Sequence, residues 1–166
     1  MQSNNLNRCV LLGLAGLAIG AVNAQEPVDW DAIDLRISHV AGNIHMLEGR
    51  GGNIGLSIGD DGVIMIDDQF APLTDRIVAA IGEVTDEEVR FLINTHVHGD
   101  HIGGNENLGN AGVLIFANDR VRMRMVDAST THAALPVVTF SDTVTLHVNG
   151  EEVHAFSVPP AHTDGD

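Results

Sequence analysis

Short apolar runs separated by glycine-containing turns mark the folded part of the chain from Ile37 onward. The first clear runs are residues 44–47, 53–58 and 63–66, and the GDDG sequence at residues 59–62 is typical of a hairpin turn. The run at residues 63–66 is apolar at every position, as expected of a strand buried on both faces of a sheet. The folded part is therefore predicted to begin with β-structure.

A helical pattern follows these strands. Pro72 suits the first position of a helix because its φ angle is already fixed. Leu73, Ile77 and Ile81 then recur one helical turn apart, which predicts a helix that ends near Gly82.

The rest of the chain continues to alternate between strand and helix patterns. The next predicted elements are a strand at residues 89–94, a short helix at 105–110, a strand at 113–116 and a helix that begins at Asn118 or Asp119. Strands are predicted last at residues 137–140, 144–148 and 153–158, and Asn149 and Gly150 form a hairpin turn between the final two. This order predicts a layered α/β fold.

Composition restricts the possible functions more than it restricts the possible folds. The chain has 166 residues, which is room for about one domain, and a formal net charge of -15. All its basic residues are arginines. Nucleic acid is a poor partner for such a chain because its binding relies on Lys and Arg to neutralise phosphates.

The N-terminus has the pattern of a secretory signal. Arg8 precedes an apolar segment, residues 9–22, which is short for a membrane span, and residues 22–24 resemble a small-residue cleavage site. We therefore expect a signal peptide at residues 1–24, cleavage after Ala24, no stable membrane anchor and a periplasmic or secreted protein. Residues 25–36 are expected to form a loosely packed N-terminal lead-in, and residues 37–166 the domain.

The sequence NTHVHGDH at residues 94–101 concentrates potential metal ligands directly after a predicted strand. His96 and His98 are two residues apart, so they can point the same way and bind one ion. Asp100 and His101 can reach a second ion nearby. Cys9 lies within the expected signal peptide, which leaves imidazole and carboxylate groups as ligands. These groups suit zinc, with iron and manganese as alternatives.

Two other interpretations of these residues are weaker. Surface histidines are common singly, but three histidines and an aspartate within six residues are the pattern of a metal site. A serine hydrolase would use Ser129 or Ser141, and neither lies in a G-x-S-x-G sequence. The remaining histidines have no ligand partner at a useful spacing and are expected to be ordinary strand, loop or surface residues: His39, His45, His132, His147 and His154.

Residues 95–101 (THVHGDH) resemble the T-H-x-H-x-D-H signature of the metallo-β-lactamase superfamily. Residues 63–67 resemble the preceding apolar strand of that family, which ends in an aspartate. Residues 161–164 (AHTD) resemble the segment that carries a later histidine. The resemblance extends over residues 37–166 and implies an αβ/βα sandwich, of which the chain holds the first half and the opening strands of the second half.

The resemblance also implies roles for individual residues. His96, His98 and His162 would bind a first metal ion, and Asp100 and His101 a second. In the family the remaining ligands of the second ion lie farther along, whereas this sequence extends only four residues beyond His162. The resemblance thus implies a truncated chain with little activity of its own. Asp67 would hold the loop or a ligand histidine, or it would be an ordinary turn aspartate.

The implied function is that of an exported zinc-dependent hydrolase, with two zinc ions in the full-length protein. A metal-held hydroxide would attack a small ester, thioester, lactone or β-lactam amide, while Asp100 orients the nucleophile and handles a proton. Iron-dependent sulfur dioxygenases share the signature and remain an alternative, as does an inactive metal-binding fragment. A nuclease is disfavoured by the acidic charge and the expected export.

Overall fold

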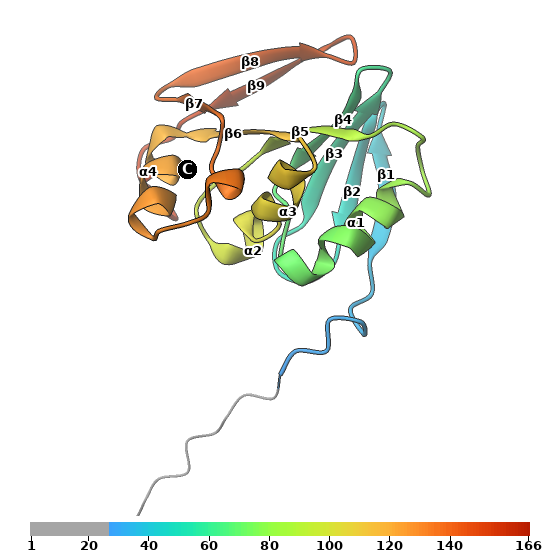
Figure 1. The fold of residues 1–166 in the computed structure, drawn as a ribbon. Coiled ribbons are helices and arrows are strands. Elements are labelled where there is room, and N and C mark those ends of the chain that lie inside the picture. The colour runs from blue at the N-terminus through green and yellow to red at the C-terminus, as the bar shows by residue number, and fades with distance from the viewer. Residues whose placement is uncertain (1–26) are drawn as a thin grey trace, which may run out of the picture.

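The computed structural model describes residues 27–166 (Figure 1). The expected signal peptide lies outside the described residues, as do the first two residues of the expected lead-in. The described part of the lead-in is anchored, although the sequence predicted loose packing. The Trp30 and Phe70 rings lie 5.3 Å apart, and the Arg76 guanidinium donates hydrogen bonds to the carbonyl oxygens of Trp30 and Ile33, at 2.5 and 2.6 Å.

A seven-stranded sheet runs through the molecule in the order β1-β2-β3-β4-β5-β6-β7. Neighbours from β1 to β4 are antiparallel, and neighbours from β4 to β7 are parallel. The strands are β1 (Arg36–Ala41), β2 (Ile44–Glu48), β3 (Ile54–Gly59), β4 (Gly62–Ile66), β5 (Val89–Ile93), β6 (Leu114–Asn118) and β7 (Val138–Phe140).

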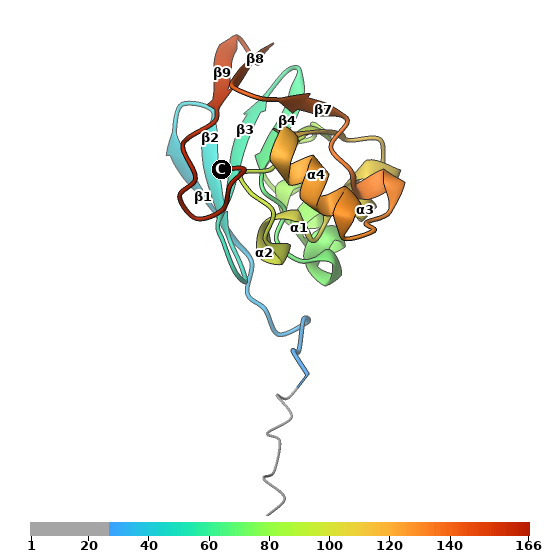
Figure 2. The ribbon, with the colours of Figure 1, turned by 90° about the vertical axis from the view of Figure 1, so that its left-hand side faces the viewer.

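The helices lie on one side of this sheet (Figure 2). They are the 3-10 helix η1 (Ala71–Leu73), α1 (Thr74–Ile81), α2 (Gly99–Ile102), α3 (Asn105–Asn110), α4 (Asp119–Asp127) and the 3-10 helix η2 (His132–Ala134). Most were predicted from the sequence, but α2 and η2 were not. None of the helices in residues 27–166 has the length and apolar character needed to cross a bilayer.

The central strands bury opposite faces in two different apolar clusters. Met65, Leu92 and Ile115 pack with α1 and α3 in the larger cluster, which also contains Ile77 and Leu108. On the other face, side chains of β4, β5 and β6 pack with β8 (Thr143–Val148): Ile64, Ile93, Phe116, Leu146 and Val148. This alternation explains why β4 is apolar at successive positions.

Strands β8 and β9 (Glu151–Phe156) form a separate two-stranded hairpin, which lies on the far side of the large sheet from α1 and α3 (Figures 1 and 2). Asn149 and Gly150 connect them with φ angles of 59° and 72°, the left-handed values that a two-residue hairpin turn requires. Asn149 N–H donates to Asp61 Oδ2 at 2.7 Å, so the hairpin tip is tied to the β3–β4 turn.

Candidate metal centre

The candidate site is built on the loops that follow β4 and β5. These strands are parallel neighbours, so their carboxyl ends meet at one edge of the sheet. The backbone N–H of Asp67 donates to Ile93 at 3.0 Å, and that of Asn94 donates to Phe116 at 2.9 Å. The two loops therefore start from fixed positions, with the histidines directly after Asn94.

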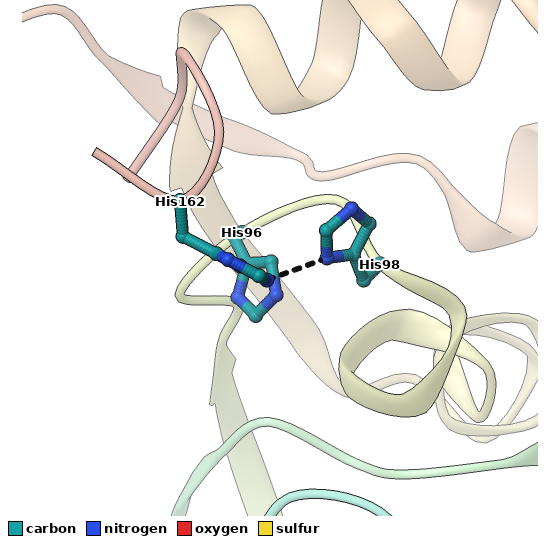
Figure 3. Close-up of side chains that lie close together, drawn as sticks. All are labelled: His96, His98 and His162. Carbon is teal, nitrogen blue, oxygen red and sulfur yellow. Dashed lines mark hydrogen bonds between the residues drawn. The ribbon is translucent and has the colours of Figure 1, made fainter. Parts of the chain in front are cut away.

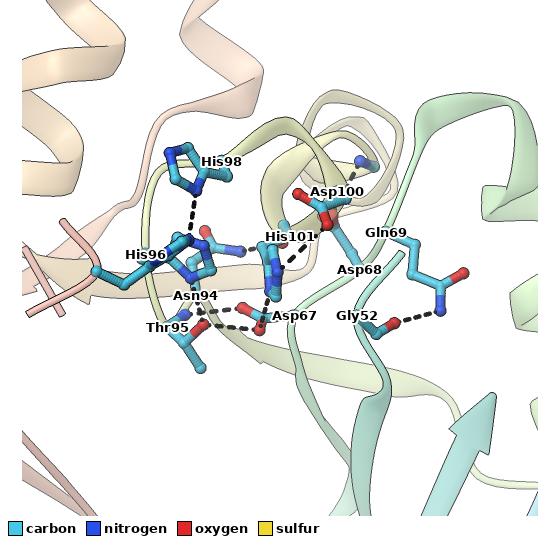
Figure 4. A network of polar contacts seen from close by, with 12 residues as sticks. Gly52, Asp67, Asp68, Gln69, Asn94, Thr95, His96, His98, Asp100 and His101 are labelled. Carbon is cyan, nitrogen blue, oxygen red and sulfur yellow. Dashed lines mark hydrogen bonds and ion pairs between the residues drawn. The ribbon is translucent and has the colours of Figure 1, made fainter. Parts of the chain in front are cut away.

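The carboxylate of Asp67 organises the beginning of the histidine loop (Figure 4). Its Oδ1 accepts a hydrogen bond from the Thr95 backbone N–H at 2.7 Å, and its Oδ2 accepts one from the Thr95 hydroxyl at 2.7 Å. Oδ2 also lies 2.7 Å from His101 Nδ1. Asp67 therefore contacts both ends of the segment that carries the candidate ligands.

A buried pair of asparagines supports the same loop from beneath. Asn94 and Asn105 exchange side-chain hydrogen bonds at 3.1 and 2.9 Å. Asn94 also donates to the His101 carbonyl oxygen at 3.2 Å, and Asn105 donates to that of Ala134 at 2.9 Å. Because buried amides need partners, this pairing connects the loop to α3 and η2 with few unsatisfied groups.

His96, His98 and His162 converge although they come from distant parts of the sequence (Figure 3). Each offers one ring nitrogen, and these three atoms lie within 4.8 Å of one another. His98 Nδ1 lies 2.9 Å from His162 Nε2. The Nδ1 of His96 lies 3.0 Å from the Thr95 hydroxyl, whereas its Nε2 is buried without a hydrogen-bond partner. A buried ring nitrogen without a hydrogen-bond partner, on a histidine whose ring lies beside two other imidazoles, fits a metal ligand.

The electrostatics of the cluster keep His96 neutral. Burial lowers the pKa of His96, the neighbouring His101, His98 and His162 lower it further, and the Asp67 carboxylate opposes the change. A metal ion binds neutral imidazole, so a low pKa favours the ligand state over the protonated state.

The loop that carries His162 is held by its own carboxylates. Asp166 accepts hydrogen bonds from the backbone N–H of His162 at 2.6 Å and from the Thr163 hydroxyl at 2.5 Å, and the hydroxyl bond contributes most to lowering the pKa of Asp166 to about 2. Asp164 accepts a hydrogen bond from Arg124 Nε of α4 at 2.5 Å. These contacts place His162 opposite the first two histidines.

Asp100 and His101 lie on α2, beside the three histidines. The rings of His96 and His101 are 4.0 Å apart between centroids, but His101 directs Nδ1 at Asp67. Its Nε2 lies 3.6 Å from Asp100 Oδ2. Among residues 27–166, only His96, His98 and His162 form a cluster of three or more close ligand atoms. The three histidines are thus the residues that could hold a first ion, with Asp100 and His101 adjacent.

Sequence reasoning missed several residues that shape the site. Thr95 was quoted only as part of the signature, yet it contacts both Asp67 and His96. Asp68 and Gln69 are fully buried next to Asp67, and Gln69 has a positive φ of 58°. Burial of polar residues directly after an apolar strand has no signal in the sequence, although the adjacent acidic pair was visible.

Comparison with known families identifies the chain. Residues 47–166 match the family model described as "Metallo-beta-lactamase superfamily". The chain belongs to this superfamily. The match includes every candidate ligand, and it confirms the family that the sequence signature predicted.

Solved metallo-β-lactamases have the same fold. The structure is similar to the enzyme from Pontibacter korlensis with a TM-score of 0.68 and 18% identity, over 80% of this chain and 65% of that one. The structure is similar to DIM-1 metallo-β-lactamase with a TM-score of 0.68 and 20% identity, over 81% of this chain and 64% of that one. It is also similar to FIM-1 from Pseudomonas aeruginosa, which was solved in a mono-zinc form. Here the TM-score is 0.65 and the identity 18%, over 80% of this chain and 62% of that one.

These similarities confirm the predicted α/β fold of the superfamily. The chain spans less than two thirds of the length of these solved structures. A comparison with curated proteins found no match.

Proposed function

We propose that this protein is a metal-dependent hydrolase of a small ester, thioester, lactone or β-lactam amide. The observation that carries the proposal is the convergence of His96, His98 and His162, each with one ring nitrogen, in a chain of the metallo-β-lactamase superfamily; His96 Nε2 is also buried without a hydrogen-bond partner. Only His96 of the three is buried, whereas His98 and His162 are exposed, so core packing does not account for their convergence.

His96, His98 and His162 would hold the ion in this proposal. Zinc suits a ligand set of three imidazoles, and when bound it would polarise a carbonyl group and lower the pKa of a water molecule. Iron binds similar ligands, and an iron-dependent oxidoreductase is therefore the alternative that the experiment must separate.

Asp100 is the group best placed to move a proton. Its side chain is 36% exposed, so it is accessible from the solvent side of the cluster. Its Oδ2 lies 3.6 Å from His101 Nε2, and His101 is held in turn by Asp67. We infer that Asp100 orients the attacking water and exchanges its proton, while Asp67 fixes His101 and the start of the loop.

Charge and the N-terminal sequence support the rest of the proposal. A formal net charge of -15 disfavours nucleic acid as a substrate and leaves small molecules. The signal-like sequence of residues 1–24 supports export to the periplasm or the medium.

A substrate panel tests this function. The protein, stripped with a chelator and reloaded with zinc, is assayed on a simple ester, a thioester, a lactone and a β-lactam. We expect slow but measurable hydrolysis of at least one class, and a loss of about 100-fold or more in kcat/KM for Asp100→Asn because a proton-transfer group is removed. His147→Asn, at an exposed position on β8, is the control and should match the wild type.

Two results would count against the proposal. Zinc-loaded protein that hydrolyses none of these substrates, while iron-loaded protein consumes oxygen with a persulfide, would favour the oxidoreductase. Equal hydrolysis by wild type and Asp100→Asn would remove Asp100 from the reaction.

A further inference from the structure

Gln69 is a polar residue with an unusual position beside the candidate site. It follows Asp67 and Asp68, its side chain is fully buried, and its backbone has a φ of 58°. A left-handed conformation is unfavourable for a residue with a Cβ atom, so surrounding contacts must stabilise it. Both hydrogen bonds of the Gln69 side chain are with a single loop.

Both ends of the Gln69 amide bind the loop between β2 and β3. Its Oε1 accepts a hydrogen bond from the Arg50 backbone N–H at 3.1 Å. Its Nε2 donates one to the Gly52 carbonyl oxygen at 2.6 Å, the bond drawn in Figure 4. On its other side, the Gln69 carbonyl oxygen accepts a hydrogen bond from Gly103 N–H at 2.9 Å, directly after α2. Gln69 thus bridges residues 49–52, which we term the glycine loop, and the end of α2.

The glycine loop presses directly on two candidate site residues. A Cβ atom built on Gly51 would lie 2.7 Å from Asp100 Cβ, and one built on Gly52 would lie 2.6 Å from His101 Cε1. Neither contact is possible for a larger residue without displacement. The backbone of the loop therefore packs against Asp100 and His101 and limits the space available to both side chains.

We propose that Gln69 is a positioning residue that clamps the glycine loop against Asp100 and His101 and so fixes the orientation of both side chains. The inference rests on the proposed function and deepens it, because Asp100 is assigned there to proton transfer and His101 lies 3.6 Å from it. Gln69 itself reaches neither a substrate nor a metal. It acts on Asp100 and His101 only by holding the glycine loop in place.

A simple packing role for Gln69 is the competing explanation, and it predicts a different result. Loss of a buried amide would then lower stability without changing His101 selectively. The clamp instead requires that release of the loop changes the environment of the His101 ring, which the loop contacts.

Nuclear magnetic resonance of the metal-free protein tests the clamp with two variants. Gln69→Ala removes both bonds to the loop, so the Arg50 amide should exchange with solvent at least about fivefold faster. The His101 ring nitrogen signals should shift or broaden. Gly52→Ala keeps the Gln69 bonds but places a methyl group against the ring, so it should shift the same His101 signals while the Arg50 amide stays protected.

Asn107→Ala is a control for the loss of two side-chain amide contacts at an exposed position. Its side-chain amide also makes two contacts, to the Ala71 carbonyl oxygen and the Thr74 hydroxyl, each at 3.2 Å, but it does not touch the glycine loop. It should leave the His101 signals unchanged. The clamp is refuted if His101 signals in Gln69→Ala match the wild type, or if Asn107→Ala shifts them equally.

A Gln69→Ala protein that does not fold still leaves Gly52→Ala as the deciding variant. Unchanged His101 signals in it would refute the contact between loop and ring. Zinc binding by the wild type is measured separately. If the protein shows the clamp but binds no zinc, the proposed function is wrong while the clamp is retained.

Discussion

At the scale of single residues, two adjacent aspartates occupy opposite environments. Asp67 contacts Thr95 and His101 through hydrogen-bond donors. Asp68 is 1% exposed, its Oδ1 accepts one bond from Gly104 N–H at 3.0 Å, and its Oδ2 has no partner. Burial raises the pKa of Asp68 to about 8, the Gly104 N–H lowers it, and the charge of Asp67 raises it further. Asp68 is therefore protonated at neutral pH.

This environment predicts that Asp68→Asn stabilises the protein at pH 8. The folded protein binds a proton at Asp68 that the unfolded chain releases above pH 3.8, so stability is lost as pH rises from about 4 to about 8. Asparagine cannot ionise and can still accept from Gly104. The free energy of unfolding at pH 8 should rise by about 2 kcal/mol or more, with little gain at pH 4.

Urea denaturation between pH 4 and pH 8 measures this difference. Asp60→Asn, at an exposed turn position, is the control and should not show a gain that grows with pH. Parallel pH profiles for wild type and Asp68→Asn would show that Asp68 titrates normally.

Residue-level prediction from the sequence depended on spacing. The close spacing of His96, His98, Asp100 and His101 predicted one segment as the site; the structure brings His96 and His98 together with His162 and places Asp100 and His101 on the adjacent helix α2. Gln69 could not be found in this way. Its role depends on a left-handed backbone and on a loop some 19 residues earlier, and neither leaves a pattern in the sequence.

At the scale of elements, the β8–β9 hairpin is attached to the sheet by its tip as well as by its apolar side. Asp61 N–H donates to Asn149 Oδ1 at 3.0 Å, and the Asn149 amide donates to the Gly62 carbonyl oxygen at 2.9 Å. Asn149 also provides a left-handed turn residue. It therefore stabilises both the turn and the attachment.

Two substitutions of Asn149 separate these contributions. Asn149→Gly keeps the favourable turn conformation and loses the side-chain bonds, whereas Asn149→Ala loses both. We expect the alanine variant to be destabilised by about 1–3 kcal/mol, and the glycine variant by less. Thermal unfolding measures the order, and an alanine variant as stable as the wild type would refute the attachment.

Elements with strong patterns were predicted, whereas the short helices α2 and η2 were not. Alternation, the asparagine–glycine turn and the helical stripe of α1 located most of the strands and helices. The four-residue helix α2 and the three-residue helix η2 have no apolar stripe. They are set by tertiary contacts, such as the bond from Asn105 to Ala134, so local sequence does not indicate them.

At the scale of the whole molecule, the fold brings together histidines that lie 64 residues apart. The sheet fixes His96 and His98 at the end of β5, and the contact between Asp164 and α4 returns the later segment to the same edge. The sequence indicated this meeting only through the resemblance of residues 161–164 to the superfamily, because His162 alone resembles any loop histidine. The proposed metal site thus depends on the assembled fold.

Zinc titration of wild type and His162→Ala tests the histidine site most directly. Calorimetry on chelator-treated protein should show a high-affinity ion in the wild type and an affinity at least about 100-fold lower in His162→Ala, because one of three ligands is lost. His147→Ala, which alters an exposed histidine on β8, should bind like the wild type. Equal zinc affinity in wild type and His162→Ala would contradict a metal site formed by His96, His98 and His162.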